Sequence, residues 1–138
     1  MAMHITIADP ITMMRFVIPV IPADVEIKTE RENTDFRTTR RYLRIFGTQK
    51  NRSIEWSSFF PVNKNYDFVE PNSVPDGWDI HNFIFRFMDN NLPVRIVVTN
   101  DNRRPVLNML ASIDNYSFRE DAVNDIQYSI RLTEFTLI

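Results

Sequence analysis

Apolar residues alternate with polar residues along much of this chain, with the period of two that a half-buried strand requires. Strands are expected over 13–17, 25–29, 51–60 and 94–99, and the alternation is clearest in 25–29 and 54–58. Pro19 and Pro22 follow the first segment, and Pro61 follows the third. Because proline lacks an amide hydrogen for the strand ladder, these residues mark strand ends or edges. The pattern predicts a mainly β protein.

Two longer segments near the C-terminus change phase partway along. The apolar positions of 106–119 move from odd to even numbers after Ile113, and those of 125–137 move from even to odd after Leu132. A strand cannot shift its apolar positions by one residue without turning over, so each shift predicts a bulge or a sharp bend. Long, bent strands joined by a turn near 121–124 favour a small antiparallel β-barrel or sandwich.

One helix is expected, over about residues 77–90. Asp76 can accept its first amide hydrogens, and Asn90, Asn91 and Pro93 mark its end. One apolar stripe at helical spacing consists of Ile80, Phe83, Ile84 and Phe87, and a second consists of Trp78, Phe85, Met88 and Leu92. We expect the first stripe to face the sheet and the second to face a loop or a neighbouring subunit.

The segment 36–47 is expected to be extended, with a helix as the alternative. Its Thr, Tyr and Ile residues favour a strand, whereas its arginines at 37, 40, 41 and 44 would also align along a helix. These arginines could contact nucleic-acid phosphates, but five acidic residues between Asp24 and Asp35 precede them, and local neutralisation disfavours that role. A solvated face or salt bridges between subunits, which would involve Arg40 and Arg44, is favoured.

A polar loop is expected over residues 62–75, with Tyr66 and Phe68 embedded among Asn, Asp and Pro. Long loops in small domains often serve as contact surfaces, and exposed aromatic residues often anchor protein interfaces. Tyr66 and Phe68, together with Trp78 and Phe85 of the helix, are therefore the candidate interface residues.

Composition narrows the class of protein. The 138 residues suit a single domain spanning 1–138, and 43% hydrophobic and 25% charged residues are ordinary for a globular chain. The formal charge of −2 gives no general attraction to nucleic acid or anionic membrane. With no Cys and two His, neither disulfides nor a metal site nor a cofactor is expected. There is no membrane-spanning stretch and no signal peptide, so we expect a protein that stays in the cytoplasm until assembly or lysis.

Catalytic arrangements are also disfavoured. Asp101, Asp114, Asp121 and Asp125 could be proposed as a paired-carboxylate site, but all lie at expected turns or strand ends, where Asp is locally favoured. Ser57 and Ser58 lack the glycine-flanked turn of a nucleophilic serine. His81 lies between the two apolar stripes of the helix and is expected to be a packing or interface residue. An enzyme is therefore not expected.

Several short motifs occur in a familiar order. They are Ile18-Pro19-Val20-Ile21-Pro22-Ala23, Gly47 followed by Ser58-Phe59-Phe60-Pro61, a helix with Trp78, Pro93-Val94-Arg95, and the final strand from Asn124 to Ser129 with Glu134-Phe135. Together they cover about residues 13–137. In this order the chain resembles the N-terminal domain of a baseplate protein family of contractile phage tails, related defective prophages and tail-like bacteriocins. Longer members of that family carry a LysM peptidoglycan-binding module.

The resemblance implies a structural role in the tail baseplate of a virion. The chain would link the hub or spike to the tail tube, template the first ring of the tube, and form a ring of its own copies. Tube, hub or spike, and sheath-proximal wedge proteins would be its partners. Because the chain has no LysM segment, peptidoglycan binding is not expected. The alternative is a stand-alone β-barrel module that binds nucleic acid or a protein ligand.

Overall fold

The structure is a computed structural model and describes residues 3–29, 31–37, 42–49, 51–64, 66–70, 73–100 and 104–135, with the backbone alone for 31–37 and 42–49. Seven strands form one antiparallel sheet in the order β2-β1-β7-β8-β9-β6-β3, and β4 and β5 form a second sheet. The strands are β1 (His4–Ala8), β2 (Arg15–Val17), β3 (Val25–Lys28), β4 (Arg31–Arg37), β5 (Tyr42–Gln49), β6 (Ser53–Phe60), β7 (Val94–Thr99), β8 (Pro105–Glu120) and β9 (Ile126–Glu134).

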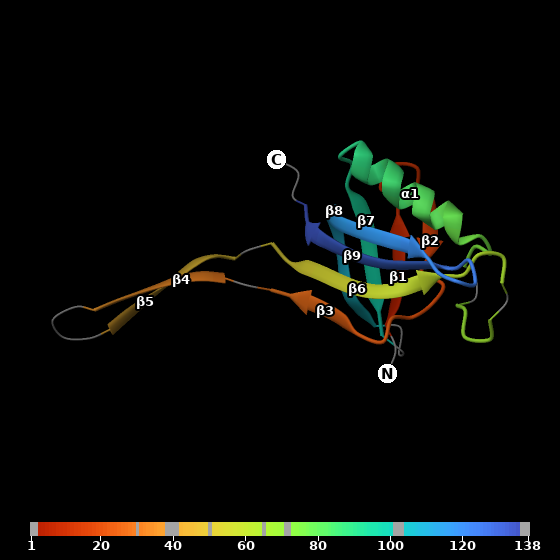
Figure 1. Cartoon of the computed structure of the whole chain (residues 1–138). Helices are drawn as coiled ribbons and strands as arrows, with labels where there is room; N and C mark the ends of the chain where they lie inside the picture. The colour runs from red at the N-terminus through yellow and green to blue at the C-terminus, as the bar shows by residue number, and fades with distance from the viewer. Residues whose placement is uncertain are drawn as a thin grey trace.

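The long strand β8 joins two parts of the curved sheet. Its first half pairs with β7 and its second half with β9 (Figure 1). The β8–β9 register shifts between Ile113 and Asn115, which confirms the bulge predicted from the phase change in this strand. The bulge predicted for the last strand is wrong, because β9 pairs with β6 without irregularity and ends at Glu134, where the apolar phase changes.

The core lies on the inner face of this curved sheet, beneath the helix. It includes Ile5 and Ile7 of β1, Ile54, Trp56 and Phe60 of β6, Ile96 and Val98 of β7, and Ile126, Tyr128, Ile130 and Leu132 of β9, all buried. Trp56 Nε1 donates a hydrogen bond to the Tyr128 hydroxyl at 2.8 Å, so the buried indole N–H has its acceptor within the core. The expected fold class, mainly β with one helix in a small barrel-like or sandwich arrangement, is confirmed.

Helix α1 (Gly77–Asp89) confirms the predicted helix and its cap, since the Asp76 side chain accepts the amide hydrogen of Trp78. Its first stripe packs on the sheet, and Ile80, Phe83, Ile84 and Phe87 are all buried. A Cβ at Gly77 would lie 2.5 Å from Phe60 Cβ, so the start of the helix fits against the end of β6 because this residue is glycine. Within the described part of the chain, no helix is long and apolar enough to cross a bilayer.

One strand was not expected from the sequence, and one segment adopts the extended structure expected for it. Strand β1 was not predicted, although Ile5 and Ile7 alternate with polar neighbours and are both buried. The segment 36–47, for which an extended structure was expected and a helix was the alternative, is extended wherever it is described, as the end of β4 and the start of β5. The hairpin of β4 and β5 extends away from the rest of the molecule (Figure 1).

Candidate functional site

The second face of α1 carries an exposed aromatic patch shared with the far half of β8. We call it the helix patch, and it consists of Trp78, Phe85 and Phe118 around His81 and Tyr116. Phe85 is 37% exposed and Phe118 is 42% exposed, and their ring centroids lie 5.4 Å apart. Trp78 is half-buried, and its ring centroid lies 5.1 Å from that of His81. The structure therefore brings the predicted residues Trp78 and Phe85 together and adds Phe118.

His81 fills the centre of the helix patch. Its Nδ1 lies 2.9 Å from the Tyr116 hydroxyl, and its ring centroid lies 4.4 Å from that of Phe118. Burial lowers the pKa of His81 and raises the pKa of Tyr116, so that both groups are neutral near pH 7. A neutral imidazole and a neutral phenol held by packing favour a structural role for this pair, which fixes the helix to β8.

A second aromatic group, the loop cluster, consists of Phe59, Tyr66 and Phe68. Tyr66 and Phe68 stack with centroids 5.1 Å apart, and both rings meet Phe59 edge-on at 6.0 Å. Phe68 is 57% exposed, whereas Tyr66 is half-buried. Of the two residues predicted as loop anchors, Phe68 therefore offers the larger free surface.

Asp125, which is buried, holds this loop to the start of β9. It accepts hydrogen bonds from the Tyr66 hydroxyl at 2.7 Å, from Lys64 Nζ at 2.7 Å and from the Val62 amide at 3.2 Å. Burial alone would raise the pKa of Asp125, but these three donors outweigh it and leave the pKa lowered. The carboxylate is thus an ionised anchor for residues 62–66.

The other carboxylates considered for catalysis also serve local structure. Asp121 accepts the amide hydrogens of Val123 and Asp125, and Asp114 accepts a hydrogen bond from Ser112. Asp101 lies outside the described residues. In the described part of the chain, no group of three or more His, Asp or Glu residues could hold a metal ion.

Of the two arginines predicted as interface residues, the structure places one, in the projecting hairpin. Arg44 lies in β5, where its Cα partner in β4 is Asp35. Arg40 lies outside the described residues.

One group of exposed apolar residues was not predicted from the sequence. It lies in the loop between β1 and β2, where Ile11 is 86% exposed, Met13 72% and Met14 53%. Asp9 fixes this loop, since its side chain accepts hydrogen bonds from the Ile11 amide at 2.9 Å and the Thr12 hydroxyl at 2.8 Å. The sequence feature that could have predicted this group is the Asp-x-x-Thr turn at residues 9–12, which is followed by large apolar residues.

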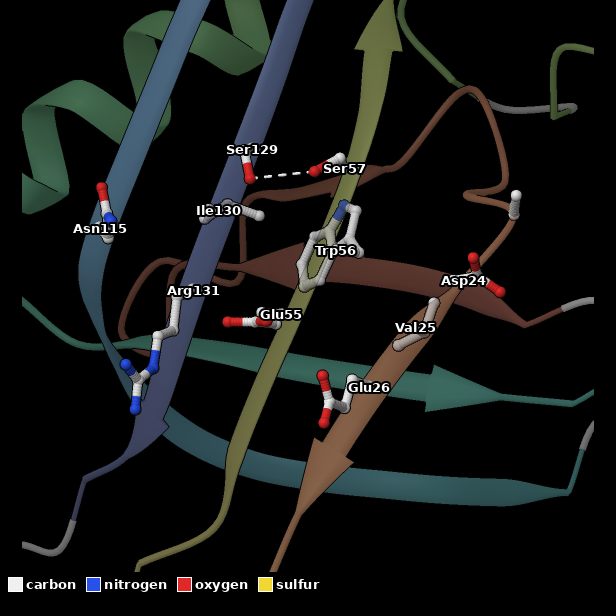
Figure 2. Close-up of a pocket in the computed structure, with 11 residues that line it drawn as sticks. Asp24, Val25, Glu26, Glu55, Trp56, Ser57, Asn115, Ser129, Ile130 and Arg131 are labelled. Carbon is white, nitrogen blue, oxygen red and sulfur yellow. Dashed lines mark hydrogen bonds between the residues drawn. The ribbon is translucent and has the colours of Figure 1, made fainter.

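The outer face of the sheet is polar and hollowed beside β3. A hollow of about 580 Å³ is lined by residues of β3, β6, β8 and β9 and by the two residues before β3. Figure 2 shows Asp24, Glu26, Glu55 and Arg131 among its lining residues. In its lining, the Ser57 hydroxyl donates a hydrogen bond to the Ser129 hydroxyl on the neighbouring strand at 2.9 Å. We call this surface the acidic hollow.

Similarity to known proteins is found in three-dimensional structure alone. No protein-family model and no curated protein sequence matches the chain. A chain in the virion of a native gene transfer agent (GTA) particle matches with a TM-score of 0.62 at 11% identity, over 96% of this chain and 92% of that one. A chain in the tail of an empty GTA particle with C6 symmetry matches with a TM-score of 0.64 at 12% identity, over 98% and 92%. At such low identity these matches establish a shared fold.

Proposed function

We propose that this chain is a structural component of a contractile tail baseplate, which links the hub or spike region to the tail tube and templates assembly of the tube's first ring. The observation that carries the proposal is the fold shared with a chain of the C6-symmetric GTA tail along nearly the full length of both chains. The ordered motifs from Ile18 to Phe135, which resemble a baseplate family, support the position at the baseplate.

The surface of the molecule suits an assembly subunit. The helix patch and the β1–β2 loop expose apolar side chains on different elements, and several exposed apolar groups are typical of a protein that contacts more than one neighbour. A ring of identical copies uses two different surfaces of each copy, one for each neighbour. We therefore propose that the chain forms a ring in the tail and contacts tube, hub or spike, and wedge proteins.

The polar groups described above are placed to hold the structure together and not to catalyse a reaction. His81 and Tyr116 are neutral and packed, and Asp121 and Asp125 hold turns and a loop. We propose that the protein has no enzymatic activity of its own and acts by its shape and its contacts, as one domain spanning 1–138, at the tail baseplate of a virion assembled in the host cytoplasm.

Deleting the gene from the cells that encode this chain tests the proposal. We expect particles that lack tails, or tube and hub parts that remain separate, because the ring that starts the tube is missing. Electron microscopy of purified particles gives the readout, and supplying the intact gene in trans should restore tails. Normal numbers of complete, infective or transfer-competent particles after deletion would refute the proposal.

A further inference from the structure

In the described backbone, the β4–β5 hairpin is joined to the seven-stranded sheet by no strand pairing. β4 and β5 pair with each other and do not join the seven-stranded sheet. Figure 1 shows the hairpin leading away from the end of β3 and from the body of the molecule. A two-stranded hairpin alone in water is marginally stable at best. A hairpin of this length is therefore expected to be held by another molecule.

The hairpin differs in charge from the rest of the chain. Residues 31–49 contain five Arg against two acidic residues, a formal charge of +3, so the rest of the chain carries −5 when the total is −2. The register places Arg37 opposite Tyr42 and Arg44 opposite Asp35 along the paired strands. A basic ribbon on an acidic body can be attracted to the body of another copy.

The acidic hollow offers a matching surface on that body. Asp24, Glu26 and Glu55 contribute three carboxylates to its lining. The cations beside them are Arg131, the Cα partner of Glu55, and Lys28, whose Nζ lies 3.6 Å from Glu26 Oε1, so one carboxylate remains in excess. Glu26 and Glu55 are Cα partners on β3 and β6, so their charges lie side by side on the sheet. The hollow also borders β3, which is the last strand of the sheet and can accept backbone hydrogen bonds from a further strand.

We propose that the β4–β5 hairpin of one copy docks in the acidic hollow of a second copy of this chain. The hairpin cannot fill the hollow of its own subunit, because it leads away from the body (Figure 1). The contact joins two different surfaces, so successive copies connect head to tail and close into a ring if the rotation allows. The contact identifies the two surfaces through which neighbouring copies meet in a ring. The existence of such a ring rests on the proposed function.

Paired charge reversals in the full chain test the contact. One variant combines Arg37→Glu with Arg44→Glu in the hairpin, and another combines Glu26→Lys with Glu55→Lys in the hollow. Sedimentation velocity across a concentration series at low salt should show wild-type self-association that each reversal weakens roughly 10- to 100-fold. Added salt should weaken the wild-type association as well.

Mixing the two variants gives the decisive result. The acidic hairpin of one variant fits the basic hollow of the other, and the reverse pairing also matches, so the equimolar mixture should associate again. A control variant, Asp67→Lys with Asp89→Lys, reverses two exposed charges outside the hollow and should associate like wild type. Circular dichroism and thermal melting of each variant verify that it is folded.

Several results would overturn the docking contact. These are a wild-type protein that stays monomeric at every concentration, a control that loses association as strongly as the hollow variant, or a mixture that stays monomeric. Tails that assemble normally with either reversal variant would also overturn it while the proposed function stands. Self-association with the expected charge pattern in a chain that is absent from tails would refute the tail role and leave this contact intact.

Discussion

Asp125 shows how one buried carboxylate positions a surface loop. Three donors from residues 62–66 converge on it, and the same loop carries Tyr66 and Phe68 of the loop cluster. The sequence pattern places Asp125 at a strand end, but its role cannot be predicted from that pattern, because its partners lie 59 to 63 positions away in the chain. Asp125 therefore positions the loop cluster without being part of the surface that the cluster exposes.

Replacing Asp125 should separate the effects of charge and shape. Asp125→Ala leaves three donors without their acceptor, and we expect a loss of about 1–3 kcal/mol in the free energy of unfolding at pH 7. The lowered pKa of Asp125 means that its ionised form stabilises the fold at pH values above the unfolded pKa of about 3.9. This stabilisation is lost as the pH falls through the folded pKa.

Urea unfolding of wild type and Asp125→Asn between about pH 7 and pH 3 measures that contribution. Wild type should lose more stability than the variant over this range, since the variant has no charge to lose at this position. Parallel pH curves for the two proteins would show that the hydrogen bonds to Asp125 do not depend on its ionisation.

Gly77 gives a second prediction for a single residue. Alanine favours a helix over glycine by about 1 kcal/mol, yet its Cβ would lie 2.5 Å from Phe60 Cβ and 2.9 Å from the Pro61 carbonyl oxygen. We expect Gly77→Ala to destabilise the protein by about 1–3 kcal/mol, because the helix start must move off β6. Asn82→Ala, at an exposed position of the same helix, should be neutral or slightly stabilising in the same thermal melts.

At the scale of elements, periodic apolar patterns predicted most of the strands and the helix. The bulge in β8 could also be foreseen, since one residue out of phase is visible in the sequence as a change from odd to even positions. Strand β1 was missed because it is short and begins almost at the N-terminus, although its alternation is clear. The β4–β5 hairpin was ambiguous because local propensity alone does not decide between a strand and a helix in a segment rich in Thr and Arg.

The two faces of α1 should respond differently to substitution. Phe83 is 3% exposed and its ring lies 5.1 Å from that of Phe16, so Phe83→Ala should cost about 3–5 kcal/mol. Phe85 is 37% exposed, and Phe85→Ala should cost no more than about 1.5 kcal/mol in the isolated protein. Thermal melts of both variants provide the comparison.

Assembly of the same two variants tests the interface role of the helix patch. Phe85→Ala should reduce incorporation of the chain into tails more than its small loss of stability explains. A melting temperature lowered as much by Phe85→Ala as by Phe83→Ala would mean that the second face belongs to the protein's own core, and the interface role would be wrong.

At the scale of the whole molecule, surfaces with different chemistry occupy different elements. The helix patch and the β1–β2 loop are apolar, the hairpin segment is basic, and the hollow beside β3 is acidic. The sequence pattern predicts part of the first surface, through Trp78 and Phe85. The hollow cannot be predicted from it, because Asp24, Glu26, Glu55 and Arg131 come together through strand pairing between distant segments.

The position of the chain in assembled particles tests the central claim most directly. A small epitope tag on the chain, followed by gold-labelled antibody and electron microscopy of purified tails, shows where it lies. We expect label at one end of each tail, where the tube meets the baseplate, and a small fixed number of copies per particle by quantitative mass spectrometry. Label along the whole tail, or a chain that is absent from purified particles, would contradict the account.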